Sequence, residues 1–271
     1  MERTLEQVRQ TTGVNAENEL RTVVWFSCGV TSAIAAKIAL EESARPVNIV
    51  YCDTGSEHPD NLRFLQDCEK WFVHPIRILK SELYTDVWDV FAKTRWLIGP
   101  KGARCTTEMK KLVRNAFERM SDLQVFGFDA RESKRALQFQ ENNPDVDLWT
   151  PLIEHELTKD DCLQMVTDAG IELPAMYKLG YMNNNCIGCV KGGIGYWNKI
   201  RQDFPEVFDR MAKLERELNV AILHYETRGP KKERIRHRMF LDELKPGRGR
   251  YGKKQAQAMS CGPICNLVDG S

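Results

Sequence analysis

The feature that most constrains this chain is an apolar run that ends abruptly in small and hydroxyl residues. Residues 23–26 read Val-Val-Trp-Phe, and residues 27–32 read Ser-Cys-Gly-Val-Thr-Ser before apolar positions recur at helical spacing. This pattern predicts a strand, a tight turn and a helix. Such a turn leaves backbone N–H groups free at the positive end of a helix dipole, where a phosphate can bind. A buried strand with an ordinary helix cap fits the same stretch, so both interpretations stay open at this point.

Strand-like and helix-like segments alternate along the first part of the chain. Strands are expected at residues 22–27, 47–52, 76–79, 123–127 and 148–153, and helices at residues 1–20, 31–42, 60–71, 84–93, 107–119 and 132–140. This alternation predicts an α/β fold with a doubly wound, mostly parallel sheet that is covered on both faces.

Three segments that follow expected strands carry polar chemistry. They are residues 27–29, residues 53–55 (Asp-Thr-Gly) and residues 128–131, which end in Arg131. Ligands of open parallel sheets bind beyond the carboxyl ends of the strands, so the three segments are expected at one cleft. Backbone amides, the Asp53 carboxylate and the Arg131 guanidinium suit a nucleotide better than an apolar ligand.

The character of the chain changes after residue 153. A helix capped by Thr158 is expected to run to residue 169, followed by an irregular segment at 183–193 and a long helix at 196–218 with a kink at Pro205. We therefore expect a nucleotide-binding domain at residues 1–175. Residues 176–271 are expected to form a cysteine-containing helical and irregular region with a basic tail.

Nine cysteines in a chain of this length indicate metal binding or thiol chemistry more than a disulfide scaffold. Cys186 and Cys189 form a C-x-x-C pair, and Cys105 lies in a similar glycine-containing context. Cys261 or Cys265 could complete a four-thiolate site. A [4Fe–4S] cluster, a structural zinc ion and metal-free thiols all stay open, and the absence of a nearby histidine favours all-thiolate ligation of any metal.

The charge of the chain is unevenly distributed. The net charge is +1, yet residues 228–254 contain eleven Lys and Arg against three acidic residues. Such a basic segment indicates a polyanionic partner such as nucleic acid, although solvated basic segments without a partner are common. The charged N-terminus lacks the apolar core of a signal peptide and no apolar run is long enough to span a bilayer, so we expect a cytoplasmic protein without membrane contact.

Five segments, in chain order, resemble one known family. Residues 27–32 are similar to the PP-loop S-G-G-x-D-S, residues 51–55 to a second-strand D-T-G, residues 127–133 to a G-x-R-x-x-E-S region, Cys105 with Lys110 and Lys111 to a cysteine-then-basic segment, and residues 179–189 to a second cysteine segment. The chain is therefore identified as a member of the phosphoadenosine-phosphosulfate (PAPS) reductase family of the PP-loop N-type ATP pyrophosphatase superfamily.

The sequence departs from the family pattern at three places. Cys28 stands where the first PP-loop glycine is usual, and Thr31 stands where ATP-cleaving members have Asp. The tail reads Ser-Cys-Gly-Pro-Ile-Cys at residues 260–265, without the Glu and His of the E-C-G-L/I-H tail of sulfonucleotide reductases.

The resemblance implies a set of roles. ATP, or alternatively PAPS or adenylyl sulfate, would bind with Mg²⁺ at the PP-loop. The phosphate-binding set is expected to be Ser27, Cys28, Gly29, Val30, Thr31 and Ser32. Asp53, with Thr54 and Gly55, would orient the ribose or Mg²⁺, while Arg131 and Arg135 would neutralise charge on the leaving group. Lys110 and Lys111 would act from the other side or form a solvated helix face.

Two enzyme classes and one binding class follow from the resemblance. In the first, the protein is an ATP pyrophosphatase that adenylates a substrate and supports sulfur transfer to nucleic acid, as in DNA phosphorothioation or tRNA thiolation, with a cysteine desulfurase as sulfur donor. In the second, it is a PAPS or adenylyl-sulfate reductase with Cys261 as nucleophile and a thioredoxin-like reductant. The third is a nucleotide-binding regulatory protein without turnover, and a homodimer stays open in all three.

Overall fold

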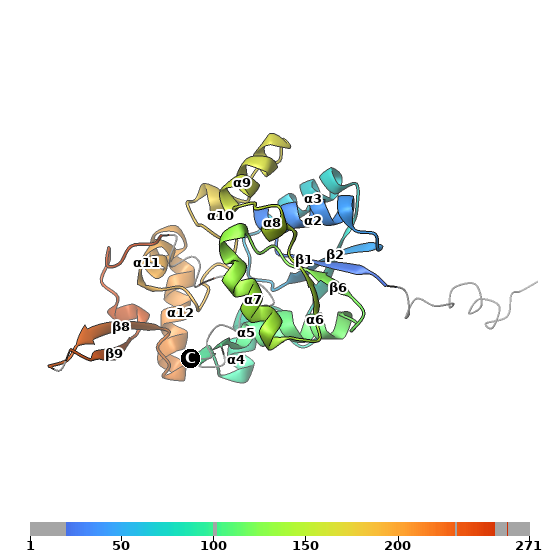
Figure 1. Ribbon diagram of the computed structural model, residues 1–271. Helices are drawn as coiled ribbons and strands as arrows, with labels where there is room; N and C mark the ends of the chain where they lie inside the picture. Colours follow the sequence, from blue (N-terminus) through green and yellow to red (C-terminus); the bar gives the residue numbers. More distant parts are fainter. Residues whose placement is uncertain (1–19, 100–101, 231, 253–258, 260–271) are drawn as a thin grey trace, which may run out of the picture.

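A five-stranded parallel sheet forms the centre of the molecule (Figure 1). The computed structural model describes residues 20–99, 102–230, 232–252 and 259. The sheet has the order β3-β2-β1-β6-β7, and every neighbouring pair is parallel. The strands are β1 (Thr22–Phe26), β2 (Val47–Asp53), β3 (Ile76–Lys80), β6 (Leu123–Val125) and β7 (Asp147–Trp149). The predicted α/β fold is confirmed, and the strand order reverses at β1.

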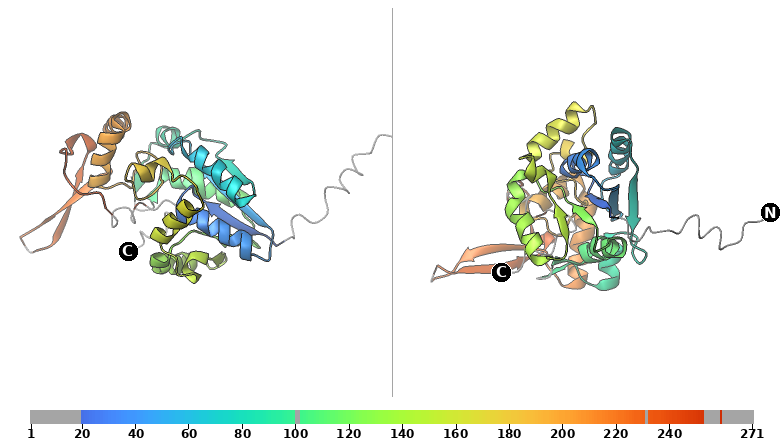
Figure 2. Two further views of the ribbon diagram at one scale, coloured as in Figure 1. Left: turned by 90° about the horizontal axis from the view of Figure 1, so that it is seen from above. Right: turned by 45° about the vertical axis from the view of Figure 1, so that its right-hand side comes forward.

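Helices cover both faces of this sheet, as Figures 1 and 2 show. One face packs against α2 (Val30–Glu42), α3 (Asn61–Phe72), α8 (Pro151–Glu154) and α9 (Lys159–Asp168). The other packs against α6 (Leu112–Phe117) and α7 (Ser133–Asn142). Every residue of β1 is buried because a central strand with both faces covered carries apolar side chains in both directions. Four buried alanines, including Ala35 and Ala36, let α2 lie close to the sheet.

A second apolar core lies beside the sheet. It joins side chains from α4, including Val90 and Phe91, to the aromatic residues Tyr196 and Trp197 of α11. Its elements are α4 (Val87–Thr94), the short strands β4 (Ile98–Gly99) and β5 (Gly102–Ala103), α5 (Arg104–Thr106), the π-helix η1 (Thr107–Lys111), α10 (Ala175–Lys178), α11 (Ile194–Asp203) and α12 (Pro205–Leu218). The division of the chain at residue 175 stays a prediction.

Several sequence-based boundaries differ from the structure. The expected strand at 148–153 ends at Trp149, because Pro151 cannot donate to a strand ladder and instead opens α8. The expected helix at 107–119 is a π-helical turn followed by α6. The expected long helix at 196–218 is two helices that break at Phe204, where Pro205 begins α12. The expected helix at residues 1–20 lies almost entirely outside the described residues.

The basic segment includes the second strand of an antiparallel hairpin that the sequence did not predict. Strand β8 (Leu223–Arg228) pairs with β9 (Arg234–Met239), and the 3₁₀-helix η3 (Leu241–Glu243) follows. In the described part of the chain, no helix has the length and apolar character needed to cross a bilayer.

Glu215 of α12 fixes both ends of this hairpin to the body of the protein. Its side chain is fully buried, and its two carboxyl oxygens accept hydrogen bonds from the backbone N–H groups of Ile222 (2.6 Å) and Leu241 (2.7 Å). Ile222 precedes β8 and Leu241 follows β9, so one carboxyl group holds the two chain segments together at the base of the hairpin.

Replacing Glu215 with alanine should destabilise the protein strongly. The change leaves two buried N–H groups without acceptors, and we expect the free energy of unfolding to fall by about 2–5 kcal/mol at pH 6. Urea denaturation measures this loss. The matched control is Glu217→Ala on the same helix, where the exposed ion pair with Arg95 should contribute no more than about 1 kcal/mol. Equal losses in the two variants would contradict the assigned role of Glu215.

Glu215 should also make stability depend on pH. Burial raises the pKa of its carboxyl group from the ordinary value of 4.5 to about 7. The folded state therefore binds this proton more tightly, and the stabilising contribution is complete below pH 4.5 and is lost as the pH rises through about 7. The free energy of unfolding of the wild type, measured relative to Glu215→Gln, should decline across this window. A flat difference would show that the group titrates normally.

Candidate functional site

The turn between β1 and α2 is held by the hydroxyl group of Ser32. This buried oxygen accepts hydrogen bonds from the backbone N–H of Ser27 (3.0 Å) and from the Ser27 hydroxyl (3.1 Å), and it donates to the carbonyl of Gly29 (2.8 Å). Cys28 lies between them with a left-handed φ of 55° and a fully buried side chain. The turn is therefore a rigid loop built around one hydroxyl group.

Backbone N–H groups at the start of α2 are available to an anion. The helix begins after Gly29, has no side-chain cap and has no acidic residue in its first turn. The hydroxyl of Tyr177 lies beside this turn, 3.3 Å from the position that a Cβ atom of Gly29 would occupy. Within the described residues, the amides of Gly29 and Thr31 have no acceptor. An uncapped helix N-terminus without carboxylates favours a phosphate group.

The end of β6 packs tightly on this first helical turn. A Cβ atom at Gly127 would lie 2.8 Å from the backbone nitrogen of Ser32 and 2.9 Å from the carbonyl carbon of Thr31. Only glycine allows this approach, which is why the β6 end can sit directly beside the turn. The glycine at the start of the 127–133 motif therefore has a packing role.

The Asp-Thr-Gly segment at the end of β2 forms its own tight turn beside β1. Asp53 accepts a hydrogen bond from the Gly55 amide (2.8 Å), and its second oxygen pairs with the ammonium of Lys80 (3.0 Å). Gly55 has a φ of 62°, and a Cβ there would lie 2.3 Å from the carbonyl oxygen of Thr85. Because β1 and β2 are parallel neighbours, Asp53 lies at the same edge of the sheet as the Ser27–Ser32 turn.

The two expected phosphate-binding arginines are each paired with a carboxylate. Arg131, in the 3₁₀-helix η2 (Ala130–Glu132), bonds to Asp160 at 3.1 Å. Arg135 bonds to Glu132 at 2.6 Å, and its guanidinium lies 5.4 Å from the ring centre of Phe128. The structure thus places both arginines after β6, with Arg131 turned toward the start of α9.

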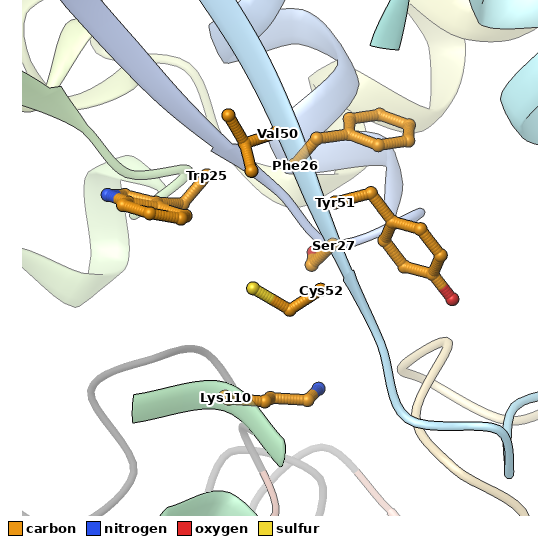
Figure 3. Close-up of a pocket in the computed structure, with 7 residues that line it drawn as sticks. All are labelled: Trp25, Phe26, Ser27, Val50, Tyr51, Cys52 and Lys110. Atoms are coloured by element: carbon orange, nitrogen blue, oxygen red, sulfur yellow. The ribbon is translucent and has the colours of Figure 1, made fainter. Parts of the chain in front are cut away.

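Lys110 lies across a small pocket from the ends of β1 and β2 (Figure 3). The pocket is lined by Trp25, Phe26, Ser27, Val50, Tyr51, Cys52 and Lys110. The ammonium group of Lys110 is 3.9 Å from a carboxyl oxygen of Glu57. Lys111 follows it at the end of the same π-helical turn. Of the two expected basic residues, Lys110 therefore lines a pocket together with Ser27, the first residue of the turn after β1.

The C-x-x-C segment of the second core closes over the edge of the sheet. The side-chain amide of Asn184 donates to the carbonyl oxygen of Cys28 (2.7 Å), and the Ile187 amide donates to the Ser56 carbonyl (2.9 Å). Asn184 also donates to the side chain of Asn61 (2.7 Å). The segment around residue 186 is thereby attached to the turns that follow β1 and β2.

The described cysteines do not form a metal centre by themselves. The sulfur of Cys186 lies 3.1 Å from the hydroxyl of Thr54 and 3.6 Å from a carboxyl oxygen of Glu57. Cys189 is buried in the same core, against which Cys105 packs. Among the described residues there is no group of three Cys, His, Asp or Glu arranged to hold a metal ion. Cys261 and Cys265, the expected fourth ligands, lie outside the described residues.

Burial keeps the cysteines beside the turn in the thiol form. It raises the pKa of Cys28 well above its ordinary value and raises the pKa of Cys52 to about 11. A protonated thiol is a poor nucleophile and a poor metal ligand. Cys28 therefore serves the turn as a core side chain.

Lys159 and Tyr177 are site residues that the sequence analysis did not single out. The ammonium group of Lys159 donates to the side chain of Asn183 (2.6 Å) and to the Met182 carbonyl, and it lies 5.3 Å from the ring centre of Tyr177. Burial lowers the pKa of Lys159. No spacing in the sequence marks either residue, because Tyr177 reaches the turn, and Lys159 reaches Tyr177, only through the packing of α9 and α10.

One family model and two known proteins are similar to this chain. The family model of the phosphoadenosine phosphosulfate reductase domain matches residues 21–193. An uncharacterized nin region protein, ORF290, of Escherichia phage lambda is 25% identical in an alignment 296 residues long. This alignment covers 92% of this chain and 95% of that protein. A crystal structure of PAPS reductase from Candida auris in complex with phosphate has a TM-score of 0.46 and 10% identity, covering 69% of this chain and 97% of that one. Because the family model spans more than half of its residues, the chain belongs to the phosphoadenosine phosphosulfate reductase domain family.

Proposed function

We propose that this protein is a PP-loop ATP pyrophosphatase that adenylates a substrate for sulfur transfer. A substrate oxygen attacks the α-phosphorus of ATP, and pyrophosphate leaves with the electron pair of the broken P–O bond. The observation that carries this proposal is the uncapped start of α2, where backbone amides without acceptors face no carboxylate in the first helical turn. Such amides stabilise the negative charge of a triphosphate without reorganisation.

Asp53 is the residue that would hold Mg²⁺ or the ribose. Its carboxylate supplies hard oxygen atoms at the carboxyl end of β2, which suits Mg²⁺. Its partner Lys80 has a side chain that is 70% exposed, so this ion pair is weak and can open for a ligand. When bound, Mg²⁺ would supply charge neutralisation on the phosphates.

Arg131 would reach the leaving group after a small rearrangement. The side chains of Arg131 and Asp160 are 52% and 56% exposed, and an exposed ion pair of this kind contributes about 1 kcal/mol or less. A polyphosphate offers the guanidinium stronger, charge-assisted hydrogen bonds. Arg135 is held more tightly because its pair with Glu132 is largely shielded from solvent. Lys110 would approach the phosphates from the opposite side of the pocket.

The acceptor of sulfur in this proposal is nucleic acid, either DNA in phosphorothioation or tRNA in thiolation. The support is the basic segment 228–254. A cysteine desulfurase would deliver the sulfur.

A sulfonucleotide reductase is the second candidate, favoured by the family to which the chain belongs. In that reaction the Cys261 thiolate would attack the sulfur of PAPS or adenylyl sulfate, forming an S-sulfocysteine and releasing the nucleotide. A thioredoxin-like dithiol would then reduce this adduct to sulfite and the free thiol, becoming a disulfide itself. A nucleotide-binding regulatory protein without turnover is the third candidate.

Ser32→Ala should impair pyrophosphate release from ATP. The change removes the hydroxyl that holds the turn through bonds of about 1 kcal/mol each, so we expect kcat/KM to fall about tenfold or more. The assay measures pyrophosphate in the presence of bulk DNA or tRNA. Ser121→Ala is the matched control, because Ser121 is exposed and precedes β6 at the opposite edge of the sheet. Absence of pyrophosphate release from the wild type with either acceptor would contradict the proposed reaction.

Cys261→Ser separates the two enzyme candidates. Under the proposed function, wild type supplied with PAPS and reduced thioredoxin should release no sulfite. Sulfite release that is lost in Cys261→Ser but kept in the neighbouring control Cys265→Ser would replace the proposal with the reductase, because only the attacking thiolate is indispensable to that chemistry.

A further inference from the structure

The β8–β9 hairpin has two chemically different faces. Its register pairs Leu223 with Met239, and side chains alternate between the two faces from each pair to the next. One face therefore carries Leu223, Tyr225, Thr227, Ile235, His237 and Met239. The opposite face carries His224, Glu226, Arg228, Arg234, Arg236 and Arg238. The hairpin is thus an amphipathic ribbon with four arginines on one side.

The apolar face anchors the ribbon to the protein. Leu223 and Met239 are 2% and 3% exposed and belong to the second core. The ring of Tyr225 stacks on His237 at 4.9 Å and is covered by the guanidinium of Arg248 at 4.9 Å. Glu215 clamps both chain segments at the base. The ribbon is therefore fixed at its base, and Figures 1 and 2 show that its far end projects away from the helices.

The arginine face has an excess of positive charge that the protein does not neutralise. Arg228, Arg234, Arg236 and Arg238 are all exposed. Arg234 lies 3.6 Å from Glu226, whereas the other three arginines have no ion pair within the described residues. Arg228 is also directly opposite Arg234 in the register, and like charges across a strand pair are destabilising. An anion that bridges the two strands would relieve this repulsion.

We propose that the β8–β9 hairpin is an arm that binds duplex DNA in the major groove through its arginine face. A two-stranded antiparallel ribbon fits the major groove of B-form DNA, where arginine is the commonest partner of guanine. Arg234, Arg236 and Arg238 form a row of about 13 Å, long enough to reach several phosphates and base edges. The deep, narrow major groove of an A-form RNA helix does not admit a ribbon, which selects DNA.

This inference rests on the nucleic-acid part of the proposed function and makes that part specific. Of the acceptors considered there, it favours DNA over tRNA. It requires no ATP cleavage, so DNA binding and pyrophosphate release can succeed or fail separately.

The test compares two triple variants of the full chain. The first variant is Arg234→Gln with Arg236→Gln and Arg238→Gln. The second variant is Lys70→Gln with Arg95→Gln and Lys213→Gln, which removes the same amount of charge at other exposed positions. Fluorescence anisotropy measures binding to a 20-base-pair DNA duplex and to the RNA duplex of the same sequence between about 50 and 200 mM salt. All six positions lie on the surface, so thermal unfolding should show both variants folded.

We expect wild type and the Lys70, Arg95 and Lys213 variant to bind the DNA duplex more tightly than the RNA duplex. The hairpin variant should bind DNA at least about tenfold more weakly, with a slope of log K against log salt that is smaller by about one for each arginine removed. Equal or tighter binding of the RNA duplex would overturn the groove assignment. Equal losses in the two triple variants would overturn the assignment to the hairpin. DNA binding without pyrophosphate release would support the arm while refuting the proposed ATP reaction.

Discussion

The hydroxyl of Ser32 is the interaction that holds the turn between β1 and α2, around which the candidate site is built. It joins the end of β1 to the first turn of α2 and holds Cys28 in a left-handed conformation that costs about 1 kcal/mol for a residue other than glycine. The energy is recovered because the Cys28 side chain fills the core between α2 and α3. Cys28, at the position of the family's usual glycine, therefore stabilises the turn through a buried side chain.

The sheet topology places this turn at the same edge as two other polar segments. Because β1 is the point where strand order reverses, β2 and β6 flank it and bring Asp53 and Arg131 to the same edge. The second core borders this edge, since Asn184 bonds to the Cys28 carbonyl and Lys110 lines a small pocket with the strand ends. A chain segment more than 150 residues away in sequence is thus attached to the candidate site.

The same second core supports the basic hairpin. Apolar side chains at the base of β8 and β9 pack with those of α11 and α12, so the arm and the cleft wall share one support. Clamping by the buried Glu215 carboxyl gives the arm a defined direction, which a basic tail without tertiary contacts would lack. The unfavourable proximity of Arg228 and Arg234 is tolerated because this anchoring is independent of the charged face.

The sequence by itself determined the parallel α/β fold and the turn after β1, because apolar periodicity and the alternation of strand-like and helix-like segments are local properties of the chain. It also located the break in the long helix, because Pro205 cannot continue the helix before it and starts α12. Only the tertiary structure decided that Lys159 and Tyr177 lie beside the turn, that Cys105, Cys186 and Cys189 do not converge by themselves, and that part of the basic segment is a ribbon. Each of these depends on long-range packing, in which distant segments meet because of the shapes they bury and not because of their spacing.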